Sequence, residues 1–405
     1  MNTTTYQLVD ICKIRSGKRL PKGTDFSAEP TAYKYIRARD IKNGIIDGSD
    51  LVYLSPEVQE KIKKYIVNTD DIVITIVGAS VGDVAYVTSE FDGVNLTENA
   101  VRLTEFARFV NSKYLMYILN SSEYWELMQQ IAGGAAQPKL GIYKIEAIEV
   151  KLPSKEQQDR IVGILSAYDD LIENNEKQIK LLEEAAQRLY KEWFVDLRFP
   201  GHENTPIVDG VPEGWSSCKL SDVISFKPKV KLTKERMKQF VPMQALSTNS
   251  MVLDTSQFTA TASNSGSKFQ NGDTLLARIT PCLENGKTAF VTGIESDEGA
   301  VGSTEFIVMR SKELNPYMVY LLARTDDFRQ AAINSMTGSD GRQRAQVDKL
   351  EVLPYLKPTR NVIDSFAHIA EPLFKQIDVK RIQIQHLTEA RDLLLPKLMN
   401  GEIEV

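Results

Sequence analysis

Two stretches of the chain carry apolar residues at alternating steps of four and three positions. The first covers residues 161–193 and the second covers residues 366–398, so each position recurs 205 residues later. The first seam consists of Ile161, Leu165, Tyr168, Ile172, Asn175, Ile179, Leu182, Ala186, Leu189 and Trp193. The second consists of Phe366, Ala370, Leu373, Ile377, Lys380, Ile384, Leu387, Arg391, Leu394 and Leu398. A period of 3.5 residues, kept over about five heptads, predicts two long helices that form a coiled coil.

Three seam positions are polar, namely Asn175, Lys380 and Arg391. Polar residues in a seam fix register and partner at a cost in stability. If the helices pair antiparallel, Asn175 and Lys380 face each other near the middle of the pair. Pro372 and Pro396 predict a kink or an early end in the second helix.

The segments in front of the two helices also repeat. Corresponding runs are residues 8–11 and 220–223, 71–74 and 273–276, 85–88 and 289–292, and 114–119 and 317–322. Short β-branched runs between Gly, Asn and Asp turns predict a mainly β domain in each copy. One helix is expected near the end of each domain, at residues 111–131 and 315–333, with Asn111 and Asn315 as N-caps.

Composition places the chain among ordinary globular proteins with a negative charge. Of its 405 residues 42% are hydrophobic and 25% are charged, which is enough for more than one buried core. The net charge of −5 weighs against a general nucleic-acid binder, which usually has a basic domain. Two local segments are basic: residues 1–64 hold 12 Lys or Arg against 8 Asp or Glu, and residues 219–238 hold 7 against 2. A solvated surface is the alternative explanation of each.

The cysteines and the hydropathy indicate the compartment. Cys12, Cys218 and Cys282 are far apart and odd in number, which argues against a disulfide framework or a zinc site and favours a reducing cytoplasm. No apolar run approaches the ~18–20 residues of a membrane span, and the first residues lack the features of a signal peptide.

The chain carries no convincing motif for catalysis or cofactor binding. Residues 281–288 resemble the end of a phosphate-binding loop, but Pro281 stands where that loop needs a glycine. No G-x-G-x-x-G follows an expected strand, and His202, His368 and His386 lack the spacing of a catalytic triad or a metal site. We therefore expect no catalytic, cofactor-binding or metal-binding residues.

The helical stretches resemble the conserved regions of the specificity subunits of type I restriction–modification systems. The resemblance is carried by residues 152–162, 171–175, 181–186, 189–202, 211–215 and 391–403. Inside the β-rich domains, residues 133–140, 280–287, 303–306 and 341–344 are similar to segments of the family. The resemblance covers essentially the whole chain and is most specific in the helices.

The resemblance implies an α+β fold, with two mainly β target-recognition domains in a pseudo-twofold repeat separated by a long antiparallel two-helix coiled coil. It assigns residues 1–152 to the first recognition domain, 153–198 to the central helix, 199–357 to a linker and the second recognition domain, and 358–405 to the C-terminal helix. A helix of about 33 residues is roughly 50 Å long, which suits two half-sites spaced by a duplex turn of about 34–36 Å.

The resemblance also implies a function and partners. Each recognition domain would read one half of a split, asymmetric site in double-stranded DNA. Two methyltransferase (modification) subunits would dock on this chain, and motor-nuclease (restriction) subunits would join them for cleavage. S-adenosylmethionine and ATP would belong to those partner subunits, so this chain would need no cofactor and no membrane.

Candidate DNA contacts follow from the chemistry of the major groove, where Arg or Lys suits guanine and Asn or Gln suits adenine. The Gly-rich loops that follow the domain helices are the first candidates. They offer Gln137 and Lys139 in the first copy, and Arg342, Gln343 and Arg344 in the second. An ordinary polar connection between a helix and a strand is the alternative explanation of both loops.

Other candidates are basic residues at regular spacing. Arg37 and Arg39 alternate on an expected strand and would share one face, as a DNA-reading surface or as a salt-bridged one. Lys227 and Lys229 alternate around Pro228, as a phosphate-facing edge or as an edge protected against strand pairing. The remaining candidates are Arg278 and Lys287, which flank Thr280-Pro281, and Lys18 in the basic turn 16–19.

Two other functions stay open on the sequence alone. A structural adaptor that bridges proteins without reading DNA would show the same repeat and coiled coil. Salt-dependent duplex binding by the assembled complex distinguishes it from a DNA reader. A methyltransferase or nuclease in its own right is disfavoured by the missing motifs, and a methylation assay of the isolated chain tests it.

Overall fold

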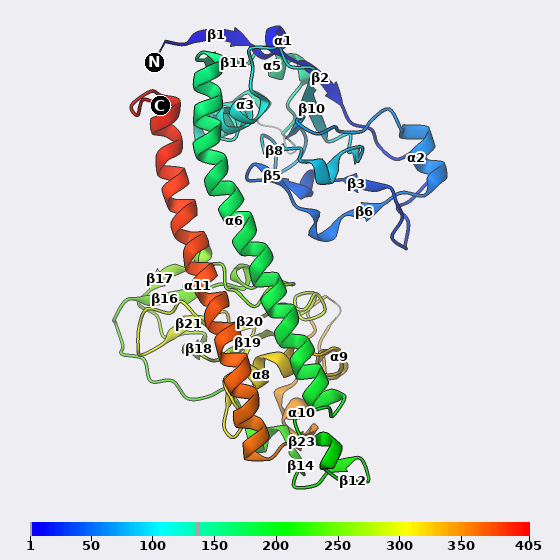
Figure 1. Ribbon diagram of the computed structural model, residues 1–405, viewed down its shortest axis with the longest axis vertical. Helices are drawn as coiled ribbons and strands as arrows, with labels where there is room; N and C mark the ends of the chain where they lie inside the picture. Colours follow the sequence, from blue (N-terminus) through cyan, green and yellow to red (C-terminus); the bar gives the residue numbers. More distant parts are fainter. Residues whose placement is uncertain (1, 134–137, 340) are drawn as a thin grey trace. The chain divides into compact units, whose positions relative to one another are not determined.

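The computed structural model describes residues 2–133, 138–339 and 341–405 (Figure 1). The chain divides into two compact units: unit 1 holds the residues up to Asp170 together with Thr388–Val405, and unit 2 holds Leu171–Leu387. The division falls inside the two long helices, so each unit contains one sheet-rich domain and part of both helices. The boundaries expected at residues 152, 198 and 357 therefore follow the order of segments along the chain and not its compact units.

Unit 1 is a mixed domain of short strands and helices. Its strands are β1 (Thr4–Gln7), β2 (Lys13–Ser16), β3 (Lys34–Ile36), β4 (Ile41–Lys42), β5 (Ile45–Ile46), β6 (Val52–Tyr53), β7 (Ile72–Thr75), β8 (Val84–Tyr86), β9 (Asn95–Leu96), β10 (Ala100–Thr104) and β11 (Glu149–Leu152). Its helices before the long one are α1 (Leu8–Ile11), α2 (Pro56–Ile62), α3 (Ser112–Leu119), α4 (Ser122–Ala132) and α5 (Ile142–Glu146). The main sheet has the order β2-β10-β7-β8, beside the sheets β6-β3-β9, β1-β11 and β4-β5.

Unit 2 repeats this plan. Its strands are β12 (Ile207–Val208), β13 (Val211–Pro212), β14 (Ser216–Lys219), β15 (Ile224–Phe226), β16 (Lys238–Val241), β17 (Thr259–Thr261), β18 (Ser267–Phe269), β19 (Thr274–Ala277), β20 (Thr288–Phe290), β21 (Ala300–Gly302), β22 (Phe306–Ser311) and β23 (Pro354–Lys357). Its short helices are α7 (Leu220–Val223), α8 (Pro316–Ala323), α9 (Asp326–Asn334) and α10 (Val347–Glu351). The main sheet, β15-β22-β19-β20, matches β2-β10-β7-β8 strand for strand, and β14-β23 matches β1-β11. The predicted repeat is confirmed.

One of the two central strands of each main sheet is buried along its whole length, as the apolar runs predicted. All four residues of β7 and all four of β19 are buried. The aspartate in front of each strand pairs with an arginine on the neighbouring strand. Arg102 lies 3.0 Å from Asp71, and Arg310 lies 2.6 Å from Asp273. The buried carboxylates that open both apolar runs are therefore neutralised within their own sheets.

The single helix expected at the end of each domain is in fact two helices, so that prediction was wrong in detail. Asn111 and Asn315 cap α3 and α8 as expected, accepting backbone N–H groups at 3.1 and 2.9 Å. Ser121 and Thr325 then cap a second helix, α4 or α9. A side chain that accepts the N–H three residues on stabilises a new helix start, and so the first helix ends before it.

The long helices are α6 (Lys155–Tyr190), extended by a π-helical turn at Lys191–Val195, and α11 (Arg360–Met399). In unit 1, Ile161 and Leu165 near the start of α6 share a core with Leu398 at the end of α11. In unit 2 the order is reversed, because Trp193, which follows α6, packs against Phe366 near the start of α11. The two helices therefore run antiparallel, and every predicted seam position is buried or half-buried. Figure 1 shows α6 and α11 alongside each other.

The prolines of α11 do not end the helix early, which was one of the two outcomes that the sequence predicted. The helix continues through Pro372 and Pro396. On either side of Pro372, Ala370 and Phe374 are buried in the core of unit 2. Their packing compensates for the backbone hydrogen bond that the proline ring removes.

Unit 1 contains a polar contact inside the seam. The hydroxyl of Tyr117 on α3 donates to Asp169 on α6, and Arg391 on α11 donates to the same carboxylate at 3.0 Å. The corresponding residues of unit 2, counted along the repeat, are Tyr320, Phe374 and Ala186. These three lie in one hydrophobic core, and the Tyr320 hydroxyl has no hydrogen-bond partner among the described residues. The contact of Tyr117, Asp169 and Arg391 thus has no polar counterpart at the equivalent positions of unit 2.

Asp169→Ala and Arg391→Ala should each lower the free energy of unfolding by about 1–3 kcal/mol, because each removes the partly buried contact between α6 and α11, although Arg391 keeps its second ion pair with Asp392. The double variant should lose less than the sum of the two, since it leaves neither charge unpaired. Urea unfolding of the four proteins measures this coupling. Lys375→Ala, which removes an exposed ion pair with Glu371 on α11, is the control and should have no measurable effect. Additive losses would contradict a direct interaction.

A second buried carboxylate ties α6 to the domain of unit 2. Glu183 accepts the hydroxyl of Ser250 at 2.7 Å and the backbone N–H of Met251 at 2.9 Å, and it is only 5% exposed. Burial raises the pKa of Glu183, and the hydrogen bonds from Ser250 and Met251 only partly oppose this.

Glu183→Gln should therefore change how stability depends on pH. A carboxyl group with a raised pKa binds its proton more tightly in the folded state, so stability falls as pH rises from its ordinary pKa of about 4.3 through the raised value. Glutamine keeps an acceptor for Ser250 and Met251 without a charge. The difference in unfolding free energy should be smallest below pH 4 and should favour glutamine increasingly towards neutral pH. Glu173→Gln, on an exposed position of α6, is the control, and an unchanged difference across pH would contradict the assignment.

Candidate nucleic-acid interface

The Gly-rich loops predicted to contact DNA occupy the same backbone position in both units. In unit 1, Leu140 donates its N–H to the carbonyl of Ile76 at 2.9 Å, and the backbone of Lys139 forms an isolated β-bridge with Val77. In unit 2, the N–H of Ala345 donates to the carbonyl of Arg278 at 2.8 Å, and the backbone of Arg344 forms an isolated β-bridge with Ile279. Lys139 and Arg344 are therefore equivalent residues. The 205-residue spacing of the repeat extends back to this loop.

The other candidates of these loops differ in their surroundings. Gln137 lies outside the described residues. Arg342 is exposed, and its backbone N–H donates to Ser339 at 3.0 Å. Gln343 is half-buried, and its carbonyl accepts the N–H of Thr280 at 3.1 Å. Lys139 is exposed. Arg342 and Lys139 thus present cationic side chains to solvent, while the backbone of Gln343 holds the loop against the sheet.

Arg344 is held by a carboxylate that the sequence did not single out. Its Nε and Nη2 atoms donate to both oxygens of Glu305, at 2.7 to 3.1 Å. These hydrogen bonds lower the pKa of Glu305, against a smaller opposing effect of burial. Glu305 is 39 positions away along the chain. The only signal for it in the sequence was the run 303–306, noted for its similarity to the family.

Arg278 and Lys287 are bound within unit 2. The Nη2 atom of Arg278 donates to the carbonyl of Ala345 at 3.0 Å, and the ammonium of Lys287 donates to the carbonyl of Met243 at 3.1 Å. Both side chains are half-buried. Arg278 therefore supports the Arg344 loop directly, and Lys287 anchors the turn that follows β19.

The predicted strand for Arg37 and Arg39 is wrong. Strand β3 ends at Ile36, and Ala38–Asp40 form a 3-10 turn with Arg37 as its N-cap. The Asp40 carboxylate explains the turn, because it accepts the backbone N–H of Arg37 at 2.8 Å. The guanidinium of Arg37 also donates to Asp40, at 2.9 and 3.0 Å, and to the carbonyl of Asp50.

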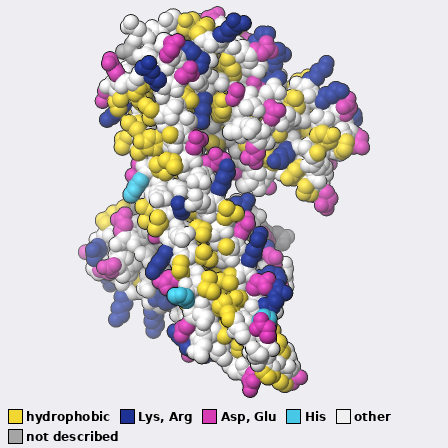
Figure 2. Space-filling model, viewed as in Figure 1, with side chains coloured by type: hydrophobic (Ala, Val, Ile, Leu, Met, Phe, Trp, Pro, Cys, Tyr) yellow, Lys and Arg dark blue, Asp and Glu magenta, His cyan; other side chains and the backbone are white. Residues whose placement is uncertain are grey.

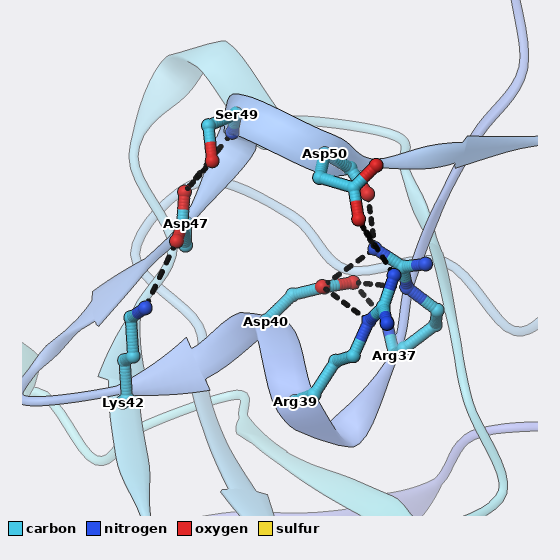
Figure 3. A network of polar contacts seen from close by, with 7 residues as sticks. All are labelled: Arg37, Arg39, Asp40, Lys42, Asp47, Ser49 and Asp50. Atoms are coloured by element: carbon cyan, nitrogen blue, oxygen red, sulfur yellow. Dashed lines mark hydrogen bonds and ion pairs between the residues drawn. The ribbon is translucent and has the colours of Figure 1, made fainter. Parts of the chain in front are cut away.

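Figure 3 shows Arg37 and Arg39 converging on Asp50. Arg39 reaches its carboxylate at 2.6 Å and is the more exposed of the two, with 64% of its side chain accessible against 17% for Arg37. Arg37 is therefore an internal clamp of the segment 37–50, and only Arg39 keeps an exposed guanidinium.

Lys18 lies in the basic turn after β2, as predicted. Its backbone N–H donates to Leu96 at 2.8 Å, and its ammonium lies 5.5 Å from the ring centre of Tyr65. Arg19 pairs with Glu98 at 2.8 Å. Asn99, the residue after Glu98, accepts the N–H of Ile76 at 2.7 Å. Backbone hydrogen bonds thus connect the Lys18 turn, through residues 96–99 and Ile76, to the Lys139 loop.

Lys227 and Lys229 do not lie on a strand edge, contrary to the prediction. Strand β15 ends at Phe226, and Lys227 has a left-handed backbone with φ of 59°. Pro228 has no N–H with which to continue the pairing. Both lysines are exposed. The contacts of the Arg344 loop include neither of them among the described residues.

Charge on the visible face is mixed: Lys and Arg side chains lie among Asp and Glu side chains (Figure 2). Across residues 2–133, 138–339 and 341–405, no group of three or more His, Cys, Asp or Glu is arranged to hold a metal ion. No helix of this part of the chain is long and apolar enough to span a membrane. The candidate contacts are therefore the individual cations of the two equivalent loops and their neighbours.

Arg37→Ala should destabilise unit 1 by about 1–3 kcal/mol, because it removes the hydrogen-bonded cation of the buried Asp40 carboxylate and leaves it only the longer 3.8 Å contact with Arg39. Arg39→Ala should leave stability almost unchanged, since its ion pair with Asp50 is exposed and its contact with Asp40 is a long one of 3.8 Å. Thermal unfolding of the two variants measures the difference. Equal effects would contradict the distinction between a clamp and a surface residue.

Comparison with known proteins finds similarity to one family. The sequence model described as "Type I restriction modification DNA specificity domain" matches residues 2–184. The MjaIX specificity subunit of Methanocaldococcus jannaschii is 29% identical over 319 residues, covering 73% of this chain and 70% of that protein. The HindI specificity subunit of Haemophilus influenzae is 22% identical and covers 98% of this chain and 99% of that protein.

The fold agrees with a solved structure. The S subunit of a type I restriction–modification system from M. genitalium superimposes with a TM-score of 0.55 at 16% identity, covering 98% of this chain and 96% of that one. This likeness supports the predicted α+β fold with two sheet-rich domains and an antiparallel helix pair. The chain is thus similar to type I restriction–modification specificity subunits, through the specificity-domain model over residues 2–184 and through relatives aligned over most of its length.

Proposed function

We propose that this chain gives a type I restriction–modification complex its DNA sequence specificity, with each sheet-rich domain reading one half of a bipartite, asymmetric site. The observation that carries the proposal is the pair of equivalent loops. The same backbone hydrogen bonds present Lys139 in unit 1 and Arg344 in unit 2. A common frame with different side chains is what reading two different half-sites requires.

The neighbours of the two loops differ as well. Around Arg344 lie Glu305 and Arg278, whereas Asn99 and Ile76 take the corresponding places around Lys139. One loop thus offers a guanidinium held by a carboxylate and the other an exposed ammonium. These groups have different hydrogen-bonding geometry, so the two half-sites they favour differ.

The two long helices would dock the partner subunits. Both helices keep exposed apolar side chains, although their seam residues are packed within the chain. The exposed residues are Leu171 and Leu181 on α6, and Ile369, Val379, Ile382 and Leu393 on α11. We assign these positions to contacts with two methyltransferase subunits, to which motor-nuclease subunits are added for cleavage. The net charge of −5 favours weak DNA binding by the chain alone, with partners completing the clamp.

The chain itself would be non-catalytic. Pro281 replaces the glycine of a phosphate-binding loop, and no dinucleotide-binding glycine motif follows a strand in the sequence. S-adenosylmethionine and ATP would be bound by the partner subunits, and this chain would need no cofactor. The three free cysteines suit work in the reducing cytoplasm.

Co-expression with the modification subunits, followed by mapping of methylated bases in host DNA, tests the proposal. A split, asymmetric consensus is expected. Duplexes containing it should compete for the complex far better than scrambled duplexes, with affinity falling steeply as salt rises from 50 to 200 mM. Gln137→Ala or Arg344→Ala should relax one half-site and leave subunit assembly intact. Methylation without a consensus, or duplex binding without preference, would favour the adaptor instead.

A further inference from the structure

The guanidinium of Arg344 is occupied along one edge only. Its Nε donates to Glu305 at 2.9 and 3.1 Å, and its Nη2 donates at 2.7 Å. Nη1 has no partner among the described residues, and Nη2 keeps a second hydrogen. The Arg344 side chain is 42% exposed. The edge formed by Nη1 and Nη2 therefore remains available to a ligand with two acceptors side by side.

The rest of the loop holds this edge in place. Arg344 exchanges backbone hydrogen bonds with Thr337 at 2.9 and 3.1 Å, and its carbonyl also accepts the side chain of Gln346 at 2.7 Å. Arg278 fixes the next residue through the Ala345 carbonyl. Glu305 is itself positioned, because its backbone N–H donates to Ser303 at 3.2 Å. A side chain held in this way loses little conformational entropy when it binds.

The acceptor pair that fits such an edge in the major groove is N7 and O6 of guanine. Adenine presents an acceptor and a donor at the same places, and the donor would face the N–H groups of the guanidinium. We propose that Arg344, aimed by Glu305, reads a guanine in the half-site bound by unit 2. The inference rests on the proposed function and specifies the base.

Unit 1 does not offer this arrangement. Asn99 stands in the place of Glu305, Ile76 in the place of Arg278, and Lys139 in the place of Arg344. An ammonium on a flexible chain is a point charge without a planar pair of donors. The guanine requirement is therefore a property of unit 2 alone, and Lys139→Ala provides a matched control in the other half of the molecule.

Arg344→Ala, Arg344→Lys and Glu305→Gln, each in the full chain co-assembled with its modification subunits, test the proposal. The methylation consensus is mapped for each, and binding is measured against duplexes with every base pair of the site replaced in turn. Both Arg344 variants should lose discrimination at one G·C pair, on the order of 10- to 100-fold, with the other half-site unchanged. Glu305→Gln should lose part of it, because Arg344 is no longer aimed.

Two controls show that the effect is local. Arg342→Ala removes the exposed neighbouring cation and should weaken binding to all duplexes alike or leave it unchanged, with the same consensus. Lys139→Ala should leave the G·C requirement intact. Co-purification of the modification subunits and thermal unfolding confirm that each variant folds. If Arg344→Ala fails to assemble, Arg344→Lys and Glu305→Gln decide the question.

The outcomes separate this inference from the proposed function. An unchanged consensus in both Arg344 variants, or lost discrimination at a pair other than G·C, overturns the guanine assignment while a bipartite wild-type consensus keeps the specificity role. Wild-type discrimination in Glu305→Gln overturns the aiming role of Glu305. A wild-type complex without any sequence preference overturns both.

Discussion

The sheets of each unit share their hydrophobic core with both long helices, and the rest of the structure depends on this burial. In unit 1, Ile74 of the main sheet and Leu115 of α3 belong to the same core as Leu165 of α6 and Leu398 of α11. Burying one such side chain stabilises the fold by about 1.5–3 kcal/mol. A helix of 36 or 40 residues gains little from propensity alone, so α6 and α11 are stable because the domains and the seam cover their apolar faces.

Polar groups fix the positions at which the long helices pack. Gln158 at the start of α6 is fully buried and binds the N–H of Asn111 at 2.8 Å and the carbonyls of Phe109 and Pro153. Its place in the repeat is taken by Ile363 in α11. Asp169 and Arg391 add a second contact that has no polar counterpart in unit 2. Apolar residues alone would tolerate a shift of one heptad, whereas the Asp169–Arg391 contact is satisfied in one register of the helix pair only, and Gln158 fixes α6 against the domain of unit 1.

Much of this fold could be predicted because its signals are local or periodic. The 3.5-residue period predicted both helices, their seam and the repeat of the domains. Short-range chemistry was harder: the Asp40 carboxylate turns the backbone at Arg37 into a 3-10 turn, and Pro228 ends β15 where alternating lysines suggested an edge. The two helices behind each domain were merged because the caps at Ser121 and Thr325 were not recognised in the sequence. Glu305 could not be assigned to Arg344, since no periodicity connects residues 39 positions apart on different elements.

In the loops that carry Lys139 and Arg344, the main chain holds the loop in place and the side chain determines what is offered to DNA. Their frame consists of main-chain hydrogen bonds, which place no demand on the side chain at either position. A substitution there can change what is offered to DNA while the fold is kept. Arg344, however, is aimed by Glu305, and its loop is supported by Arg278. An arginine placed at 139 would meet Asn99 and Ile76 and would lack a carboxylate to orient it. A change in the base that is read therefore requires a change of the orienting carboxylate as well as of the arginine. Specificity depends on the pair of Arg344 and Glu305 and not on Arg344 alone.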